Sequence, residues 1–206
     1  MTSKSTTDWT TARFVVVDVE GNGRQPPDIV EFGAVAIENG AIVGTPCEWL
    51  VRPTESISHI VSRLHGITNE MVAGSPSFKD IAGLVREVLR NDYLVAHNAK
   101  VELGVLRPKL EGWSPRGVVD TLRLARDLLP GRKSYALTAL TKDLDLVPSE
   151  NEVGRGPHRA GYDALATARL FLHLARTEYG TPRALSTLLG VEDTPVSSSS
   201  RQGDLF

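Results

Sequence analysis

Residues 14–20, FVVVDVE, place a run of apolar, mostly β-branched residues directly before two acids. The run is short and is followed by the turn-forming segment GNGRQPPD at 21–28, a pattern typical of a buried central strand. Side chains alternate across a strand, so Asp18 and Glu20 are expected on the same face. Two like charges beside a core are costly unless something neutralises them, and a divalent cation with oxygen ligands is the simplest partner. The alternative is that the strand ends at Asp18 and that water solvates both acids.

The rest of the chain predicts an α/β domain in which helices pack on a mixed sheet. Residues 29–37 and 41–51 are predicted strands joined by the hairpin dipeptide Asn39-Gly40, so part of the sheet is expected to be antiparallel. Beyond them, the apolar pattern predicts strands at 93–98 and 117–120 and helices at 78–90, 99–110, 121–129, 134–144, 160–179 and 181–190. Ser134 is the expected cap of one helix, and Thr181-Pro182 is expected to begin the last.

Composition and charge favour a soluble, cytoplasmic, globular protein. The 206 residues are 41% hydrophobic and 23% charged, with a net charge of -2 at pH 7. A slightly acidic chain does not suit tight, sequence-independent duplex binding, which rests on many phosphate contacts from Lys and Arg. The single cysteine, Cys47, excludes an internal disulfide and a cysteine-based zinc site. The sequence shows neither a bilayer-spanning apolar run nor the apolar core of a signal peptide, so no membrane role is expected.

Three regions are predicted along the chain. Residues 1–11 are polar and are expected to form a flexible N-terminus, and residues 12–190 form the folded domain. From residue 191 to 206 the composition becomes polar, with a run of four serines, and predicts a flexible C-terminal tail.

Two further groups of polar residues follow predicted strands or begin predicted helices. His97 and Asn98 end a predicted strand, where α/β proteins place their ligands, and Glu102 falls in the first turn of the next helix. The alternative role for Glu102 is that of a helix-dipole partner. His158 lies in a glycine-containing loop, and Asp163 begins the following helix. Their alternatives are a solvent-exposed loop histidine and a second first-turn acid.

Together, the three groups resemble the histidine-bearing branch of the DEDD 3′–5′ exonuclease superfamily, typified by the proofreading epsilon subunit of bacterial replicative polymerases. The resemblance is carried by D-x-E at 18–20, H-N-A-x-x-E at 97–102 and H-x-x-x-x-D at 158–163. The segments that agree with it are IVEFGAV, LHGIT at 64–68, VVDTLRLARDLLP at 118–130 and SYALTAL. The likeness covers about residues 13–178 and implies a ribonuclease-H-like fold.

The resemblance implies phosphodiester hydrolysis with two divalent metals, which lie ~3.5–4 Å apart in sites of this kind. It places Asp18 between both metals. Glu20 and Asp163 would bind the first metal, and Glu102 would assist the second. His158 would act as general base on the attacking water, because histidine ordinarily titrates near neutral pH. An all-oxygen ligand set favours Mg²⁺ or Mn²⁺.

Contacts with the terminal nucleotide are also implied by the resemblance. The residues implied are Gly21, Asn22, Leu64, His65, His97 and Asn98. Leu64 and His65 match the family segment that packs against the last bases. The alternative for Leu64 is ordinary core packing.

The sequence departs from the family pattern at two places. The family usually has Thr after the D-x-E pair, whereas this chain has Gly21 and Asn22, so a backbone contact is kept without the hydroxyl. The acid after the H-N-A segment is usually Asp, and here it is Glu102. A carboxylate that reaches the second metal through water tolerates the longer arm. We therefore expect activity with an altered metal preference or rate, and weak or lost activity is the alternative.

The end of the chain resembles the short clamp-binding peptide of bacterial polymerases and repair proteins. The residues that match are Gln202, Asp204, Leu205 and Phe206. Leu205 and Phe206 would fill an apolar pocket on the sliding clamp, Gln202 would hydrogen-bond beside it, and the serine linker would give reach. The alternative is an unrelated tail that happens to end in Leu-Phe.

These features predict a metal-dependent 3′–5′ exonuclease that shortens single-stranded or mismatched DNA ends to nucleoside monophosphates, in proofreading, repair or end trimming. The first alternative is a nuclease of the same fold specialised on RNA, oligonucleotides or small nucleotides. The second is a catalytically degenerate module that binds nucleic-acid ends, which only Glu102 favours. No polymerase domain is predicted, so proofreading would require a partner.

Overall fold

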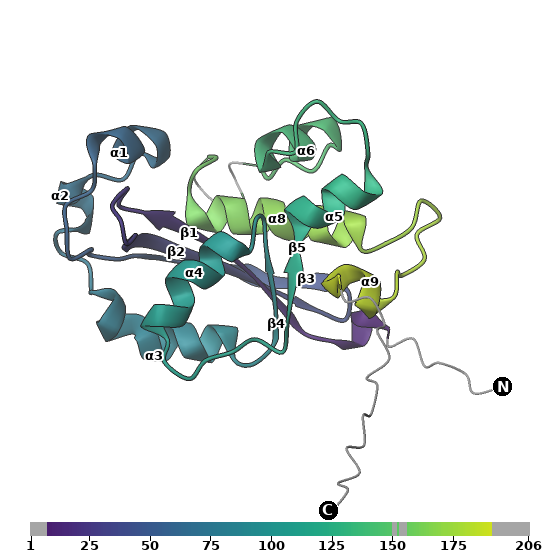
Figure 1. The fold of residues 1–206 in the computed structure, drawn as a ribbon, viewed down its shortest axis with the longest axis horizontal. Helices are drawn as coiled ribbons and strands as arrows, with labels where there is room; N and C mark the ends of the chain where they lie inside the picture. Colours follow the sequence, from purple (N-terminus) through teal and green to yellow (C-terminus); the bar gives the residue numbers. More distant parts are fainter. Residues whose placement is uncertain (1–7, 150–151, 153–155, 191–206) are drawn as a thin grey trace, which may run out of the picture.

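A five-stranded mixed sheet in the order β3-β2-β1-β4-β5 forms the centre of the computed structural model, which describes residues 8–149, 152 and 156–190 (Figure 1). The strands are β1 Phe14–Gly21, β2 Ile29–Glu38, β3 Ala41–Leu50, β4 Tyr93–Ala96 and β5 Gly117–Asp120. β1, β2 and β3 pair antiparallel, as the hairpin signal predicted, whereas β4 runs parallel to β1 and β5 parallel to β4. The predicted α/β class with a mixed sheet is therefore confirmed.

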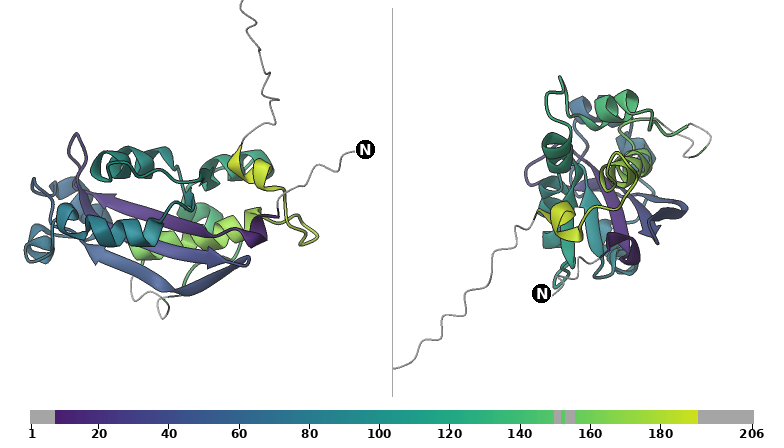
Figure 2. Two further views of the ribbon diagram at one scale, coloured as in Figure 1. Left: turned by 90° about the horizontal axis from the view of Figure 1, so that it is seen from below. Right: turned by 90° about the vertical axis from the view of Figure 1, so that its right-hand side faces the viewer.

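Helices cover both faces of the sheet (Figure 2). The helices are the 3₁₀ helix Trp9–Thr11, α1 His59–His65, α2 Asn69–Val72, α3 Phe78–Leu89, α4 Lys100–Lys109, α5 Thr121–Leu128, α6 Leu137–Asp143, α8 Ala160–Leu174 and α9 Leu185–Leu189. α8 lies across the sheet and contacts β1, β2, β3 and β4, with α5 and α6 packed against it. α3 and α4 pack on the opposite face.

The alternation of side chains on β1 separates the two cores. Phe14 and Val16 are buried in the core that contains α8, whereas Val15 and Val17 are buried in the core that contains α3 and α4. Asp18 and Glu20 continue the register of Phe14 and Val16, so they emerge on the α8 face of the sheet. Asp18 and Glu20 of β1 therefore lie beneath the N-terminal end of α8.

Three predicted helix boundaries were wrong, each because of a tertiary contact. α6 begins at Leu137 with Ala136 as N-cap, not with Ser134, because the carbonyl of Tyr135 pairs with the ring of His97 at 2.9 Å. α8 ends at Leu174, because the carbonyl of Ala175 accepts hydrogen bonds from the Trp9 indole and from Arg183 N–H. The chain then reverses, with Pro182 opposite Arg176, and α9 starts only at Leu185. Helices α1 and α2 were not predicted from the sequence.

The described part of the predicted flexible N-terminus is ordered. Trp9 is fully buried, and its indole N–H donates to Ala175 O at 3.1 Å, which ties residues 8–11 to the end of α8. Residues 1–7 and the predicted tail at 191–206 lie outside the described residues. Within the described chain, no helix is both long and apolar enough to cross a bilayer.

Candidate active site

The two acids of the opening motif sit on a strand that continues past them. β1 extends to Gly21, so the alternative in which the strand ends at Asp18 is wrong. Both residues are partly buried, and the strand register places Asp18 opposite Gly33 and Glu20 opposite Glu31 on β2. They therefore lie at the carboxyl end of the strand, on the face that α8 covers.

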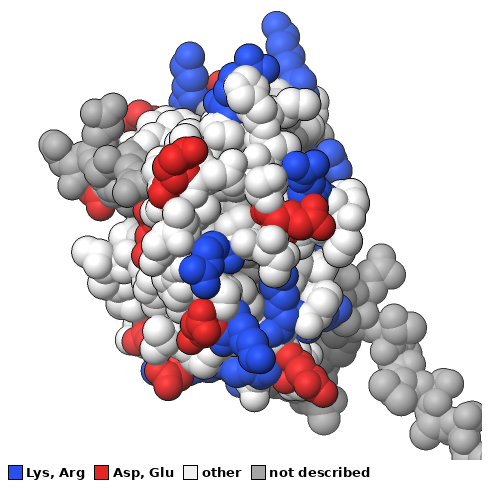
Figure 3. Space-filling view, turned by 90° about the vertical axis from the view of Figure 1, so that its left-hand side faces the viewer, with Lys and Arg blue, Asp and Glu red and all other residues white. Residues whose placement is uncertain are grey.

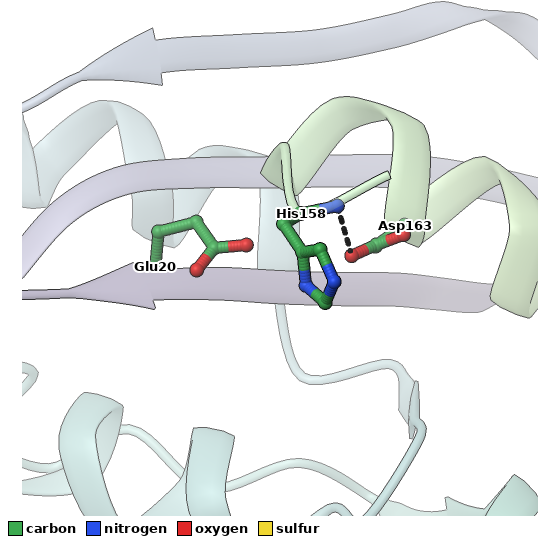
Figure 4. Close-up of side chains that lie close together, drawn as sticks. All are labelled: Glu20, His158 and Asp163. Carbon is green, nitrogen blue, oxygen red and sulfur yellow. Dashed lines mark hydrogen bonds between the residues drawn. The ribbon is translucent and has the colours of Figure 1, made fainter. Parts of the chain in front are cut away.

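The start of α8 brings His158 and Asp163 to these acids. One ligand atom from each of Glu20, His158 and Asp163 can be chosen so that all three atoms lie within 4.8 Å of one another. The imidazole of His158 lies between the two carboxylates, and its backbone N–H donates to Asp163 Oδ2 at 3.1 Å (Figure 4). His158 adopts a left-handed backbone conformation with φ of 62°, which is uncommon for a residue with a side chain. The loop is thus held in a specific shape that presents the imidazole, which is exposed, to solvent.

Glu102 adds a fourth carboxylate from the other side of the sheet. It lies in the first turn of α4 and is 4% exposed. Its Oε2 is one of three buried side-chain atoms in the described chain that lack a hydrogen-bond partner, together with Asp163 Oδ1 and Thr167 Oγ1. Buried oxygens of this kind are costly unless a partner satisfies them, and carboxylate oxygens are the ligands that Mg²⁺ and Mn²⁺ favour. The residues present therefore fit a divalent cation.

Burial and mutual repulsion raise the pKa values of the carboxylates. Burial raises the pKa of Asp18 well above its ordinary value, and the nearby charge of Asp163 adds to the effect. Burial, reinforced by Asp163, raises the pKa of Glu20 to about 8. The pKa of Glu102 also rises to about 8, and that of Asp163 to about 6, in both cases chiefly through burial. A bound cation would reverse this penalty, because it favours the charged form of every carboxylate around it.

Gly21 and His65 are joined in a contact beside the acids. His65 is buried, its Nδ1 accepts a hydrogen bond from Ile67 N–H, and its Nε2 therefore donates to Gly21 O at 3.3 Å. Leu64, its neighbour on α1, is 57% exposed, so the core-packing alternative for Leu64 is wrong. An exposed leucine on a helix at the edge of the site can contact a base, as the sequence predicts.

Asn22 and His97 are already engaged within the protein. The Asn22 side chain is 1% exposed, and its Oδ1 accepts from the backbone N–H groups of Arg24 and Asp28. The ring of His97 bonds Thr121 Oγ1 and Tyr135 O, both at 2.9 Å. The two side chains thus hydrogen-bond within the protein, and their predicted contacts with substrate stay predictions.

Asn98 helps to line a hollow at the surface of the protein. It has a left-handed backbone with φ of 78°, and its N–H donates to Asp120 Oδ1 at 3.0 Å. His97, Asn98, Arg126, Lys133 and Tyr135 are among the residues that line this hollow. Its position beside the carboxyl ends of β4 and β5 is where open α/β sheets bind ligands.

The surface around α1 and α2 carries both signs of charge. Lysine and arginine side chains are interspersed with acids on this face, rather than gathered into one broad basic patch (Figure 3). This agrees with the net charge of -2 and indicates that a polyanion would be held locally, with bound cations contributing.

The Exonuclease family (RNase_T) matches residues 15–171, which contain β2 to β5, β1 except for Phe14, and α8 as far as Phe171. The chain belongs to this exonuclease family. Its fold is accordingly the ribonuclease-H-like α/β fold that the resemblance implied, and the matched range contains the three motifs at 18–20, 97–102 and 158–163.

Similar proteins include a bacterial exonuclease and a subunit of a bacterial DNA polymerase. The 3′-5′ exonuclease DinG of Bacillus subtilis (strain 168) is 36% identical over 169 residues, which are 79% of this chain but 17% of that protein. DNA polymerase III subunit epsilon of Buchnera aphidicola subsp. Schizaphis graminum (strain Sg) is 30% identical over 79% of this chain and 74% of the relative. The chain thus spans a small part of the first relative and most of the second.

A solved structure of exonuclease X in complex with 5′ overhanging duplex DNA superposes with a TM-score of 0.71. The sequence identity is 31%, and the match covers 86% of this chain and 98% of the other. The similarity therefore extends over a whole exonuclease chain and not only over the strands of the sheet.

Two buried charged residues beside the site, Glu31 and Arg159, were not predicted from the sequence. Glu31 is a buried acid within the apolar strand β2, and Arg159 is the buried residue between His158 and α8. A signal was present, because a glutamate within the otherwise apolar run IVEFGAV requires a partner if it is buried. The partner is 128 positions away, and only the fold reveals it.

Proposed function

We propose that this protein is a metal-dependent 3′–5′ exonuclease that shortens single-stranded or mismatched DNA ends and releases nucleoside 5′-monophosphates. The observation that carries the proposal is the convergence of Glu20, His158 and Asp163 within 4.8 Å, beside buried carboxylate oxygens that have no partner. The family match and the DNA-bound similar structure support it. Proofreading, repair and end trimming are the processes that such an activity serves.

The four carboxylates are the residues that would hold Mg²⁺ or Mn²⁺. They are Asp18, Glu20, Glu102 and Asp163. Bound divalent ions supply charge neutralisation at the phosphoryl oxygens and at the departing oxygen. The longer side chain of Glu102 would reach the site from the first turn of α4, where its Oε2 is buried and has no hydrogen-bond partner among the described residues.

The protein's own groups would then position and deprotonate the reacting water. A ring nitrogen of His158 accepts a proton from water, whose oxygen forms a bond to phosphorus. The bond from phosphorus to the 3′-oxygen of the preceding nucleotide breaks, and that oxygen takes up a proton. The products are a nucleoside 5′-monophosphate and a strand one nucleotide shorter. Leu64 and the backbone at Gly21 would bind the terminal nucleotide.

The test is degradation of a 5′-labelled single-stranded DNA oligonucleotide in Mg²⁺ or Mn²⁺, with Asp18→Asn and His158→Ala as controls. A ladder that shortens from the 3′ end, and that both substitutions abolish, is the expected result. An intact oligonucleotide in both metals would reject the activity on DNA.

The same assay on matched RNA decides the substrate sugar. The net charge of -2 and the mixed surface charge favour short or single-stranded substrates, and both DNA and RNA can meet this requirement. We propose DNA, because the similar subunit epsilon belongs by name to a DNA polymerase and the similar exonuclease X structure is by name a complex with DNA. Faster release of ribonucleotides than of deoxyribonucleotides would reverse this assignment.

The chain's last residues are proposed to bind a bacterial sliding clamp. The sequence Gln202-Gly203-Asp204-Leu205-Phe206 and the serine linker before it support the proposal, and this segment lies outside the described residues. A synthetic peptide of residues 197–206 is expected to bind the clamp, and replacement of Leu205 and Phe206 by alanine is expected to abolish binding. Absence of binding at high micromolar concentration would reject it.

A further inference from the structure

A buried ion pair connects the central sheet to the start of α8. Glu31 on β2 is fully buried, and Arg159 Nε donates to both of its carboxylate oxygens, at 2.9 and 3.1 Å. Arg159 Nη2 also contacts Glu31 Oε1, and it reaches Glu48 Oε1 on β3 at 3.4 Å. A buried carboxylate is costly unless it is paired and hydrogen-bonded, so a glutamate in this strand is retained only with its full set of partners.

The same carboxylate also holds the backbone of α8. Ala160 N–H, one of the free donors at the start of the helix, donates to Glu31 Oε2 at 2.8 Å. Glu31 therefore contacts both the side chain of Arg159, the helix N-cap, and the main chain of the next residue. His158 directly precedes this anchored pair, and Asp163 follows it within the first turn of the helix.

Glycines allow the helix to approach the sheet at this point. A Cβ atom at Gly33 would lie 2.2 Å from the carbonyl carbon of Ala160, and a Cβ atom at Gly161 would lie 2.4 Å from Glu48 Oε2. Both distances are far below any van der Waals contact. The main chain of Ala160 thus lies directly against Gly33 of β2, and the ion pair and the Ala160 hydrogen bond hold the start of α8 in this position.

Glu31 is also the cross-strand neighbour of Glu20. The register of β1 with β2 pairs Glu20 with Glu31, and both side chains face α8. The anchor thus lies between the two halves of the candidate site, with Glu20 on the sheet and His158 with Asp163 on the helix. A shift of α8 by a fraction of an ångström would change the spacing of all three.

We propose that Glu31, acting through Arg159, is a positioning residue that sets the distance between Glu20 on the sheet and the His158–Asp163 pair on α8. This inference rests on the proposed nuclease function for its catalytic consequence. It predicts that loss of the ion pair lowers turnover and cation affinity, although neither Glu31 nor Arg159 is a proposed metal ligand or the proposed base.

The test compares Glu31→Gln with Glu38→Gln, a change of the same kind at the other end of β2. Glu38 is half-exposed and pairs with Arg13, away from the site. Glutamine keeps the size of Glu31 but removes the charge that binds Arg159. The expected result for Glu31→Gln is a ~10–100-fold fall in kcat, a comparable loss of Mn²⁺ affinity and an unchanged KM. Glu38→Gln is expected to leave all three near the wild-type values.

A second variant covers the case in which Glu31→Gln fails to fold. Arg159→Lys retains a cation but cannot bind both carboxylate oxygens with a planar fork, so an intermediate loss of kcat and of Mn²⁺ affinity is expected. Both variants are assayed well below their unfolding temperatures, so that the measured rates are those of fully folded protein.

The outcomes separate this inference from the proposed function. In one outcome, the wild-type protein hydrolyses DNA while the folded variants keep its kcat and its Mn²⁺ affinity. That result would overturn the positioning role and leave the nuclease function intact. Wild-type protein without nuclease activity would reject the function, and the Mn²⁺ affinities would still decide the role of Glu31. If Glu38→Gln loses as much kcat and Mn²⁺ affinity as Glu31→Gln, the inference is also overturned, because removal of any charge from β2 would then have the same effect.

Discussion

The two carboxylate oxygens of Asp163 have different surroundings: Oδ2 accepts the backbone N–H of His158 at 3.1 Å, whereas Oδ1 is buried without a partner. One oxygen thus holds the loop that presents the imidazole, and the other is available to a cation. A single side chain couples the shape of the loop to the metal site.

Replacement of Asp163 by asparagine is expected to lower kcat at least ~100-fold, because the substitution removes a charged ligand and weakens the loop contact. Steady-state hydrolysis of a DNA oligonucleotide over a range of Mg²⁺ concentrations measures this. The matched control is Asp143→Asn on α6, where the exposed carboxylate pairs with Arg132 and the rates should not change. Equal kcat values for the two variants would contradict the role of Asp163.

Replacement of Glu102 by aspartate is expected to keep activity, whereas replacement by glutamine is expected to reduce it ~100-fold or more. Aspartate restores the acid usual in the family, and its shorter side chain leaves a small cavity at a residue that is 4% exposed. Glutamine keeps the volume but removes the charge. The ratio of Mn²⁺- to Mg²⁺-supported rates reports the change in metal preference. If the glutamine variant is as active as the wild-type protein, Glu102 has no part in the reaction.

The stability of the metal-free protein is expected to depend on Glu20. Burial raises the pKa of Glu20 from an ordinary value of 4.5 to about 8, so the folded protein holds this proton more tightly than the unfolded chain. The associated stability is present below about pH 4.5 and is lost as the pH rises toward 8. Glu20→Gln, which cannot ionise, should therefore become more stable than the wild-type protein as the pH rises, by on the order of 3 kcal/mol near pH 8.

Urea unfolding of both proteins in a chelator, at about pH 5 and pH 8, measures this difference. Added Mg²⁺ should stabilise the wild-type protein and reduce the difference in stability between it and Glu20→Gln, because a bound cation neutralises the charge of Glu20. A difference in stability that does not vary with pH would show that Glu20 ionises freely in the folded protein.

Replacement of Asn22 by alanine is expected to destabilise the protein by ~1–3 kcal/mol, because it leaves the buried N–H of Asp28 and the partly buried N–H of Arg24 without an acceptor. The loop from 22 to 28 shapes the edge of the site, so KM should rise as well. Thermal unfolding and initial rates measure the two effects. The prediction fails if stability is unchanged and only KM responds, which would instead assign Asn22 to direct substrate contact.

The strands and the acids were predictable because local sequence encodes them. The segment FVVVDVE predicts both a buried strand and two acids on one of its faces. The hairpin dipeptide Asn39-Gly40 predicts the antiparallel pairing of the two strands that it joins, β2 and β3. Helix α1 escaped prediction for the opposite reason: Ile60 and Leu64 face solvent, so its apolar residues do not mark a buried face. Features set by distant partners, such as the delayed start of α6 opposite His97, are not encoded locally.

The spatial grouping of the site was predictable only through the family resemblance. From residue types alone, Glu102, His158 and Asp163 each had an ordinary alternative, and spacing along the chain does not bring them together. The fold places Glu20, His158 and Asp163 within 4.8 Å. The support from Glu31 and Arg159 was beyond prediction, because the two residues are separated by 128 positions.

The carboxylates around Asp18 are proposed to bind the divalent ions on which hydrolysis depends, and a titration of Mn²⁺ into the wild-type protein and into Asp18→Asn, followed by electron paramagnetic resonance near pH 7.5, tests this most directly. About two bound Mn²⁺ ions per wild-type chain are expected, with weaker or partial binding by Asp18→Asn and loss of DNA hydrolysis. A wild-type chain that binds no Mn²⁺, or an Asp18→Asn variant that binds the ions and degrades DNA as the wild-type protein does, would contradict this role of the carboxylates.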